Sequence, residues 1–86
     1  MYEIIISPHA NRELKRIEKI YERAISEAIK DIREDPFLGK PLTREFTGKF
    51  SYRVGLFRII YKVNTEDKIV NIISAGHRST IYDKLY

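Results

Sequence analysis

The spacing of apolar residues changes once along this chain, and that change constrains the fold more than any other feature. Between Leu14 and Ile32, apolar residues recur at three- and four-residue steps, the stripe of an amphipathic helix. From Phe50 onwards they recur at every second residue, as in strands that bury one face. Residues 1–6 add the signal of a short, buried strand before the helical region. This order predicts an α+β domain with helical segments packed on one face of an antiparallel sheet.

Capping and helix-breaking residues predict where these elements end. Ser7-Pro8 is typical of an N-cap followed by proline at the first helical position, and Asp35-Pro36 ends the helical region. The sequence offers no internal glycine or proline to decide whether residues 8–34 form one helix or a tight pair. Residues 36–49, which contain two glycines and Pro41, are typical of a loop.

Composition argues against several classes of protein. The chain has 86 residues, enough for one domain, which we place at residues 1–86. It has no cysteine and only two histidines, so we expect no disulfide, no metal centre and no cofactor. Its apolar runs, such as Ile4-Ile5-Ile6, are far shorter than the roughly 20 residues of a membrane span. The N-terminus lacks a signal-peptide pattern, so a cytoplasmic protein is expected.

The net charge of +4 is unevenly distributed. Residues 1–40 hold eight basic and eight acidic side chains, whereas residues 41–86 hold eight basic and four acidic ones. The whole excess therefore belongs to the second half of the chain. Such asymmetry suggests an anionic partner for that half, either nucleic acid or an acidic protein segment. The alternative is charge that only keeps the protein soluble.

The first hairpin of the predicted sheet brings two arginines together. Gly55-Leu56 fits a two-residue type II′ loop. That loop pairs Val54 with Phe57 and Arg53 with Arg58. Like charges in a cross-strand pair are destabilising by a few tenths to about 1 kcal/mol, so we expect a sheet that keeps both arginines there to use them on an anion. The alternative is that one of them pairs with Glu45 or with a C-terminal acid.

The second hairpin is predicted to extend this basic site. Residues 68–75 are apolar on both faces, as in a central strand, and Glu66-Asp67 would form the preceding turn. This turn places Arg58 opposite Ala75 and lets Gly76-His77-Arg78 run out beside Arg58. Three arginines and one histidine then gather at one end of a sheet face, with a lysine further along it. The candidate residues of this cluster are Arg53, Arg58, His77, Arg78 and Lys62.

Tyr82 follows Arg78 by four residues. If residues 79–85 are helical, the two side chains share a face, and an exposed tyrosine beside arginines suits base stacking. The alternative for Tyr82 is packing of a short terminal helix on the sheet. His77 alone is weak evidence of a site, because a lone histidine is more often structural than catalytic.

These residues resemble a known family. Residues 52–61 (YRVGLFRIIY), followed by Gly76-His77-Arg78 and then Ile81-Tyr82, are similar to the RelE/ParE superfamily of toxins from bacterial and archaeal toxin–antitoxin systems. The resemblance covers nearly the whole chain. It implies a small antiparallel sheet of about four strands with an N-terminal helical hairpin on one face, and therefore two helices within residues 8–34.

The RelE branch is the more similar one, and the resemblance to it implies a metal-independent endoribonuclease that cuts mRNA, in many members on the ribosome. In that chemistry a ribose 2′-hydroxyl attacks the adjacent phosphate and expels the 5′-oxygen. Arg53 matches a basic catalytic position, Arg58 a phosphate-binding arginine, Arg78 the arginine of a late turn and Tyr82 a C-terminal tyrosine. His77 falls where relatives carry lysine or histidine, and its reference pKa suits proton transfer. Further RNA contacts are assigned to Arg44, Lys49 and Lys62.

One departure from the family pattern keeps a second function open. Gly55 stands where some members carry a lysine that activates the nucleophile, which leaves the general base unassigned. Loss of that lysine also occurs in the ParE branch, whose members poison DNA gyrase without cutting RNA. A third possibility is a non-catalytic relative that only binds nucleic acid or antitoxin. In each case the resemblance implies an acidic, amphipathic antitoxin that wraps the toxin in a hetero-oligomer.

Overall fold

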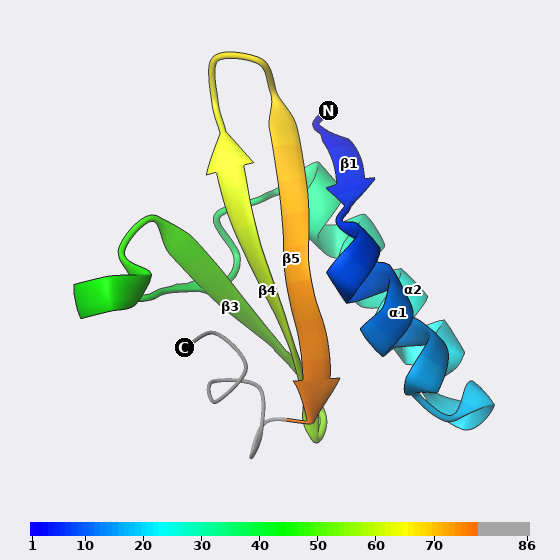
Figure 1. Ribbon diagram of the computed structural model, residues 1–86. Helices are drawn as coiled ribbons and strands as arrows, with labels where there is room; N and C mark the ends of the chain where they lie inside the picture. The colour runs from blue at the N-terminus through cyan, green and yellow to red at the C-terminus, as the bar shows by residue number, and fades with distance from the viewer. Residues whose placement is uncertain (78–86) are drawn as a thin grey trace.

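The computed structural model describes residues 1–77, which form two helices and a five-stranded sheet (Figure 1). Single turns of 3-10 helix at Lys19–Tyr21 and Arg44–Phe46 join some of these elements. In the sheet the strands lie in the order β1-β5-β4-β3-β2. The elements in chain order are β1 (Glu3–Ile6), α1 (Pro8–Arg16), α2 (Glu22–Glu34), β2 (Lys40–Pro41), β3 (Lys49–Val54), β4 (Phe57–Asn64) and β5 (Ile69–His77).

The helical region is a hairpin of two helices, as the family resemblance implied. The Ser7 hydroxyl caps α1 by accepting a hydrogen bond from the Ala10 N–H at 3.0 Å. The chain leaves helical geometry at Ile17 and Glu18, whose ψ angles are 134° and 142°. α-Helical geometry resumes in α2, which ends at Glu34 before the predicted Asp35-Pro36 break.

The sheet is mixed, and this differs from the expected small antiparallel sheet of about four strands. Strand β1 pairs with β5 in parallel, while the other neighbours are antiparallel. The fifth strand is the two-residue β2, within the segment expected to be a loop. Because β1 has a neighbour on one side only, Ile5 and Ile6 are 41% and 39% exposed. The expectation that residues 1–6 form a buried strand was therefore wrong for these two side chains.

The core lies between the helical hairpin and one face of the sheet. Strand β5, which has a neighbour on each side as predicted for an interior strand, and strand β4 form its floor, and both helices cover it (Figure 1). Tyr61 is fully buried there. Its hydroxyl donates to the Pro36 carbonyl at 2.7 Å and accepts from the Gly39 N–H at 3.0 Å. The main contributors to the core are Ala10, Ile25, Ala28, Ile32, Ile59, Tyr61, Val70, Ile72 and Ala75.

Candidate functional site

The hairpin of β3 and β4 has the predicted register. Gly55 has a φ of +59°, and Leu56 is not among the residues with positive φ, which fits a type II′ loop. Val54 pairs with Phe57, and Arg53 pairs with Arg58. The two arginines are therefore direct cross-strand neighbours on the face of the sheet that points away from the helices.

The two arginines differ in how firmly they are held. The half-buried Arg58 donates from Nη1 to the hydroxyl of Ser51 at 2.9 Å, and Ser51 is only 2% exposed. The exposed Arg53 makes a long contact from Nε to its own hairpin loop, 3.5 Å from the Gly55 carbonyl. The sequence analysis assigned no role to Ser51, although its alternation in β3 already placed it on the face of the arginines. Arg58 is thus a preorganised cation beside a more exposed and less firmly held one.

Two lysines continue this arrangement along the same strands. Lys49 pairs directly with Lys62, and strand alternation puts both on the face of Arg53 and Arg58. Four residues of strand, about 13 Å, separate the two pairs. We call Lys49, Arg53, Arg58 and Lys62 the basic row. Arg44 lies outside it, exposed in the 3-10 turn before β3, at the end of that strand far from the hairpin (Figure 1).

A β-bulge in β5 corrects the predicted second hairpin. From the turn to the pair Tyr61–Ile72 the register is the predicted one, but Ile60 then pairs with Ser74. Ile73 is the extra residue, so every later pair is displaced by one position. Arg58 therefore lies opposite Gly76, and the expectation that it faces Ala75 was wrong.

The bulge also moves His77 to the other face of the sheet. His77 pairs with Phe57, and the centroids of their rings are 6.2 Å apart, edge to face. Phe57 itself contacts Tyr21 beside the helices, with ring centroids 5.0 Å apart. The predicted gathering of His77 with Arg53 and Arg58 on one face is therefore not found.

Arg78 and Tyr82, the remaining candidates, lie outside the described residues. Within residues 1–77, no group of three or more His, Cys, Asp or Glu side chains is arranged to hold a metal ion. Over the same residues, no helix is both long and apolar enough to cross a membrane.

Comparison with known proteins assigns the family. The family model described as the ParE toxin of the type II toxin–antitoxin system parDE matches residues 4–82. The chain belongs to the RelE/ParE toxins. It is 34% identical over 83 residues to the toxin RelG of Mycobacterium tuberculosis, covering 94% of this chain and 95% of RelG. It is 32% identical over 83 residues to the toxin RelE of the same organism, covering 94% of this chain and 86% of that protein.

Solved structures agree with this assignment. The toxin–antitoxin complex RelBE2 of M. tuberculosis contains a chain with 34% identity and a TM-score of 0.83, over 90% of this toxin and 98% of that chain. The archaeal RelE–RelB complex of Pyrococcus horikoshii gives 25% identity and a TM-score of 0.74, over 90% and 94% of the two chains. This protein is therefore a toxin of a type II toxin–antitoxin system with a RelE-like fold.

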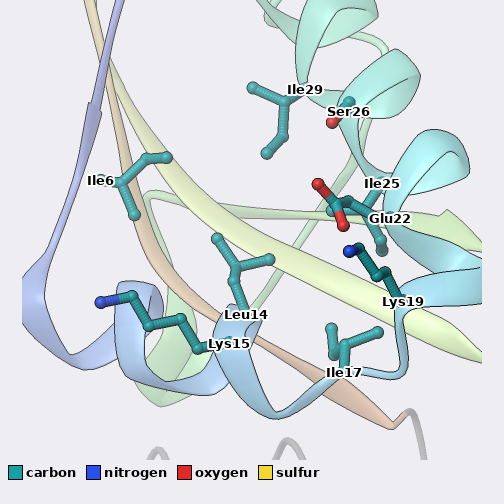
Figure 2. Close-up of a pocket in the computed structure, with 9 residues that line it drawn as sticks. All are labelled: Ile6, Leu14, Lys15, Ile17, Lys19, Glu22, Ile25, Ser26 and Ile29. Carbon is teal, nitrogen blue, oxygen red and sulfur yellow. The ribbon is translucent and has the colours of Figure 1, made fainter.

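The toxin also carries an apolar cleft on the side of the helices. The cleft has a volume of about 590 Å³ and lies between β1, α1 and α2. Ile6, Leu14 and Ile29 point into it from these three elements, and Lys15 and Lys19 lie at its rim (Figure 2). The sequence analysis missed it because the helical stripe was assigned wholly to the core.

Proposed function

We propose that this toxin is a metal-independent endoribonuclease that cuts mRNA on the ribosome, with Arg53 and Arg58 at the scissile phosphate. The observation that carries the proposal is the direct pairing of these two arginines, one of them anchored by a buried serine. In the reaction the 2′-hydroxyl loses its proton and its oxygen attacks phosphorus. The bond from phosphorus to the 5′-oxygen breaks, leaving a 2′,3′-cyclic phosphate and a 5′-hydroxyl after that oxygen gains a proton.

The arginine pair fits the electrostatic demand of this reaction. Negative charge builds on the phosphate oxygens in the transition state, and guanidinium groups fixed in advance stabilise it without reorganising. A guanidinium also matches phosphate geometry with two parallel N–H donors. Arg58, held by Ser51, would supply the fixed donor, while Arg53 would close on the bound phosphate. Lys49 and Lys62 would contact neighbouring phosphates along the strand direction, and Arg44 would contact RNA beyond them.

Two further roles are carried over from the family resemblance. Arg78 would stabilise charge near the leaving group, and Tyr82 would stack on a base to position the substrate. His77 carries an imidazole, a side chain suited to proton transfer, but it pairs with Phe57 on the other face of the sheet. We therefore expect that His77→Gln retains cleavage within about threefold.

The deciding experiment incubates the purified toxin with mRNA-programmed ribosomes and with free mRNA, and maps the ends of the products. We expect 2′,3′-cyclic phosphates whose formation is unchanged by EDTA. Removing one donor that stabilises the developing negative charge lowers rates by about 10²–10³-fold. We expect a loss of this size for Arg58→Ala and for Arg53→Ala. Arg23→Ala, on the exposed side of α2, is the matched control. Intact mRNA under all these conditions would reject the nuclease.

Inhibition of DNA gyrase is the second candidate. It is favoured by the match to the ParE family model, because the ParE branch contains gyrase poisons. A supercoiling assay with purified gyrase separates the two functions. Inhibition of gyrase together with intact mRNA on ribosomes would establish this second candidate in place of the first.

We also propose that the partner of this toxin is a cognate antitoxin with an acidic, amphipathic segment. The proposal is supported by the apolar cleft, whose lining carries two lysines, Lys15 and Lys19, against one acidic residue, Glu22. An amphipathic helix would bury its apolar side on Ile6, Leu14 and Ile29 and place acidic residues beside the lysines. The solved relatives that are toxin–antitoxin complexes support the same partner class.

A further inference from the structure

Strand β5 continues beyond its partner on one side. Strand β1 ends at Ile6, which pairs with Ile72. Among residues 1–77, the last five residues of β5, starting at Ile73, therefore have no strand on that edge. Unpaired backbone groups at a covered edge are costly, so they need other partners. These five residues include the bulge and Gly76, the residue opposite Arg58.

Helix α1 and its N-cap residue supply partners for this edge through one side chain each. The Ser7 hydroxyl donates to the Ile73 carbonyl at 3.2 Å. Six residues later, Oε1 of Glu13 accepts from the Ala75 N–H at 3.2 Å and from the Ser74 hydroxyl at 2.7 Å. The carboxylate of Glu13 therefore bonds the two residues immediately before Gly76.

The Glu13 carboxylate that makes these two hydrogen bonds is buried. It is only 5% exposed, and burying a carboxylate costs several kcal/mol unless hydrogen bonds or ion pairs offset the loss of water. Its Oε1 lies 3.1 Å from Nε2 of His9, one helical turn earlier. Its Oε2 approaches Gly76, where an added Cβ would lie 3.8 Å away. A residue that only filled space here would be apolar.

We propose that Glu13 is a positioning residue for the basic row. By holding Ser74 and Ala75 after the bulge, it fixes the register that places Gly76 opposite Arg58. Through that pairing it also fixes the position of Arg58 along β4 relative to β5. This inference rests on the proposed nuclease function for its kinetic readout, but not for its structural one. Glu13 contacts β5, the strand next to the one that carries Arg58, and in this proposal it touches no RNA.

The experiment compares Glu13→Gln, Glu13→Asp and Glu13→Ala in the full chain. Glutamine keeps an acceptor at the Oε1 position, so cleavage and strand geometry should stay within about threefold of the wild type. Aspartate is one methylene shorter and alanine has no acceptor. We expect both to raise amide hydrogen exchange at Ala75 at least tenfold while leaving Val70, near the start of β5, unchanged. Glu27→Gln, exposed on α2, is the control for loss of a carboxylate.

The kinetic arm separates positioning from stability. Measured well below the melting temperature, Glu13→Ala should lower kcat about tenfold with KM within twofold, because phosphate contacts along the basic row persist while alignment at the reacting phosphate is lost. A lower melting temperature with kcat unchanged would overturn the proposal, and so would unchanged exchange at Ala75. If the wild-type chain cuts no RNA, the nuclease function fails on its own. Exchange at Ala75 and the side-chain NMR signal of Arg58 then decide the role of Glu13, because both shift if it positions the strand.

Discussion

At the scale of single residues, the buried hydroxyl of Tyr61 holds the loop between α2 and β2 in place. It donates to Pro36 and accepts from Gly39, and both contacts are buried. The ring also stacks on Phe50, with centroids 5.5 Å apart. Gly39 has no room for a side chain, because an added Cβ would collide with this hydroxyl. The one hydroxyl therefore determines both the path of the loop and the residue allowed at position 39.

Tyr61→Phe should destabilise the toxin because it leaves a buried carbonyl and a buried N–H without their partner. An unsatisfied buried group costs about 1–3 kcal/mol, which lowers the Tm of a domain this small by roughly 4–8 °C per kcal/mol. Differential scanning calorimetry measures this shift. Tyr21→Phe, at a more exposed ring, is the control, and an equal change in both variants would contradict the assignment.

The same residue makes the stability of the toxin sensitive to alkali. Burial raises the pKa of Tyr61, and the nearby Asp35 and Tyr52 raise it further, while the hydrogen bond from Gly39 acts in the opposite direction. The folded state therefore favours the neutral phenol. This contribution is complete below the unfolded pKa of about 10 and is lost as the pH rises through the folded pKa. The difference in urea midpoint between the wild type and Tyr61→Phe should accordingly shrink only as the pH rises above about 10.

At the scale of elements, the two hairpins show what the sequence could predict. The β3–β4 hairpin was predictable because Gly55 fixes a two-residue loop and every later pair follows from it. The β4–β5 hairpin was predictable only as far as Ile72. Residues 69–75 are apolar on both faces apart from Asn71 and Ser74, so an extra residue at Ile73 leaves no visible break in the pattern. The displaced faces of Gly76 and His77 follow from that one bulge.

Glu13 was missed for a related reason. A glutamate in a helix rich in charge is usually exposed, and nothing in its type marks it as buried. Its spacing did carry a signal, because it lies three residues after Ala10 and four before Ile17, on the apolar stripe of the helical region. A carboxylate on such a stripe needs partners from another element. Here they come from the free edge of β5.

Binding of the antitoxin in the cleft between β1 and the two helices can be tested with a charged substitution. Ile6→Asp places a charge in the cleft at a side chain that is 39% exposed, so we expect the fold to survive and antitoxin affinity to fall at least tenfold. Ile20→Asp is the matched control, because Ile20 is 79% exposed and does not line the cleft. Isothermal titration calorimetry with the cognate antitoxin measures both. Equal affinities for the two variants would place the antitoxin elsewhere on the toxin.

At the scale of the whole molecule, the charge asymmetry of the sequence places basic side chains on one face of the sheet. The first half of the chain, with balanced charge, forms the helices that cover one face of the sheet, while strands β3 and β4 carry the basic row on the other. The four cations of the row form two pairs along two adjacent strands. A single strand of RNA that runs parallel to these strands would therefore contact first one pair and then the other. Binding by such a surface is driven largely by the release of counterions from the phosphates.

This arrangement predicts how RNA affinity depends on salt. For single-stranded nucleic acid the slope of log K against log salt is about −0.7 per neutralised phosphate, so four contacts from the basic row give a slope of about −3. Lys62→Gln should reduce the magnitude of that slope by about 0.7 and weaken binding to RNAs of any sequence to a similar extent. Lys30→Gln, exposed on α2, should leave the slope unchanged. Fluorescence anisotropy with a non-cleavable 2′-deoxy oligonucleotide, measured at several KCl concentrations, provides these slopes. A slope near zero, or equal effects of the two substitutions, would show that RNA does not bind along β3 and β4.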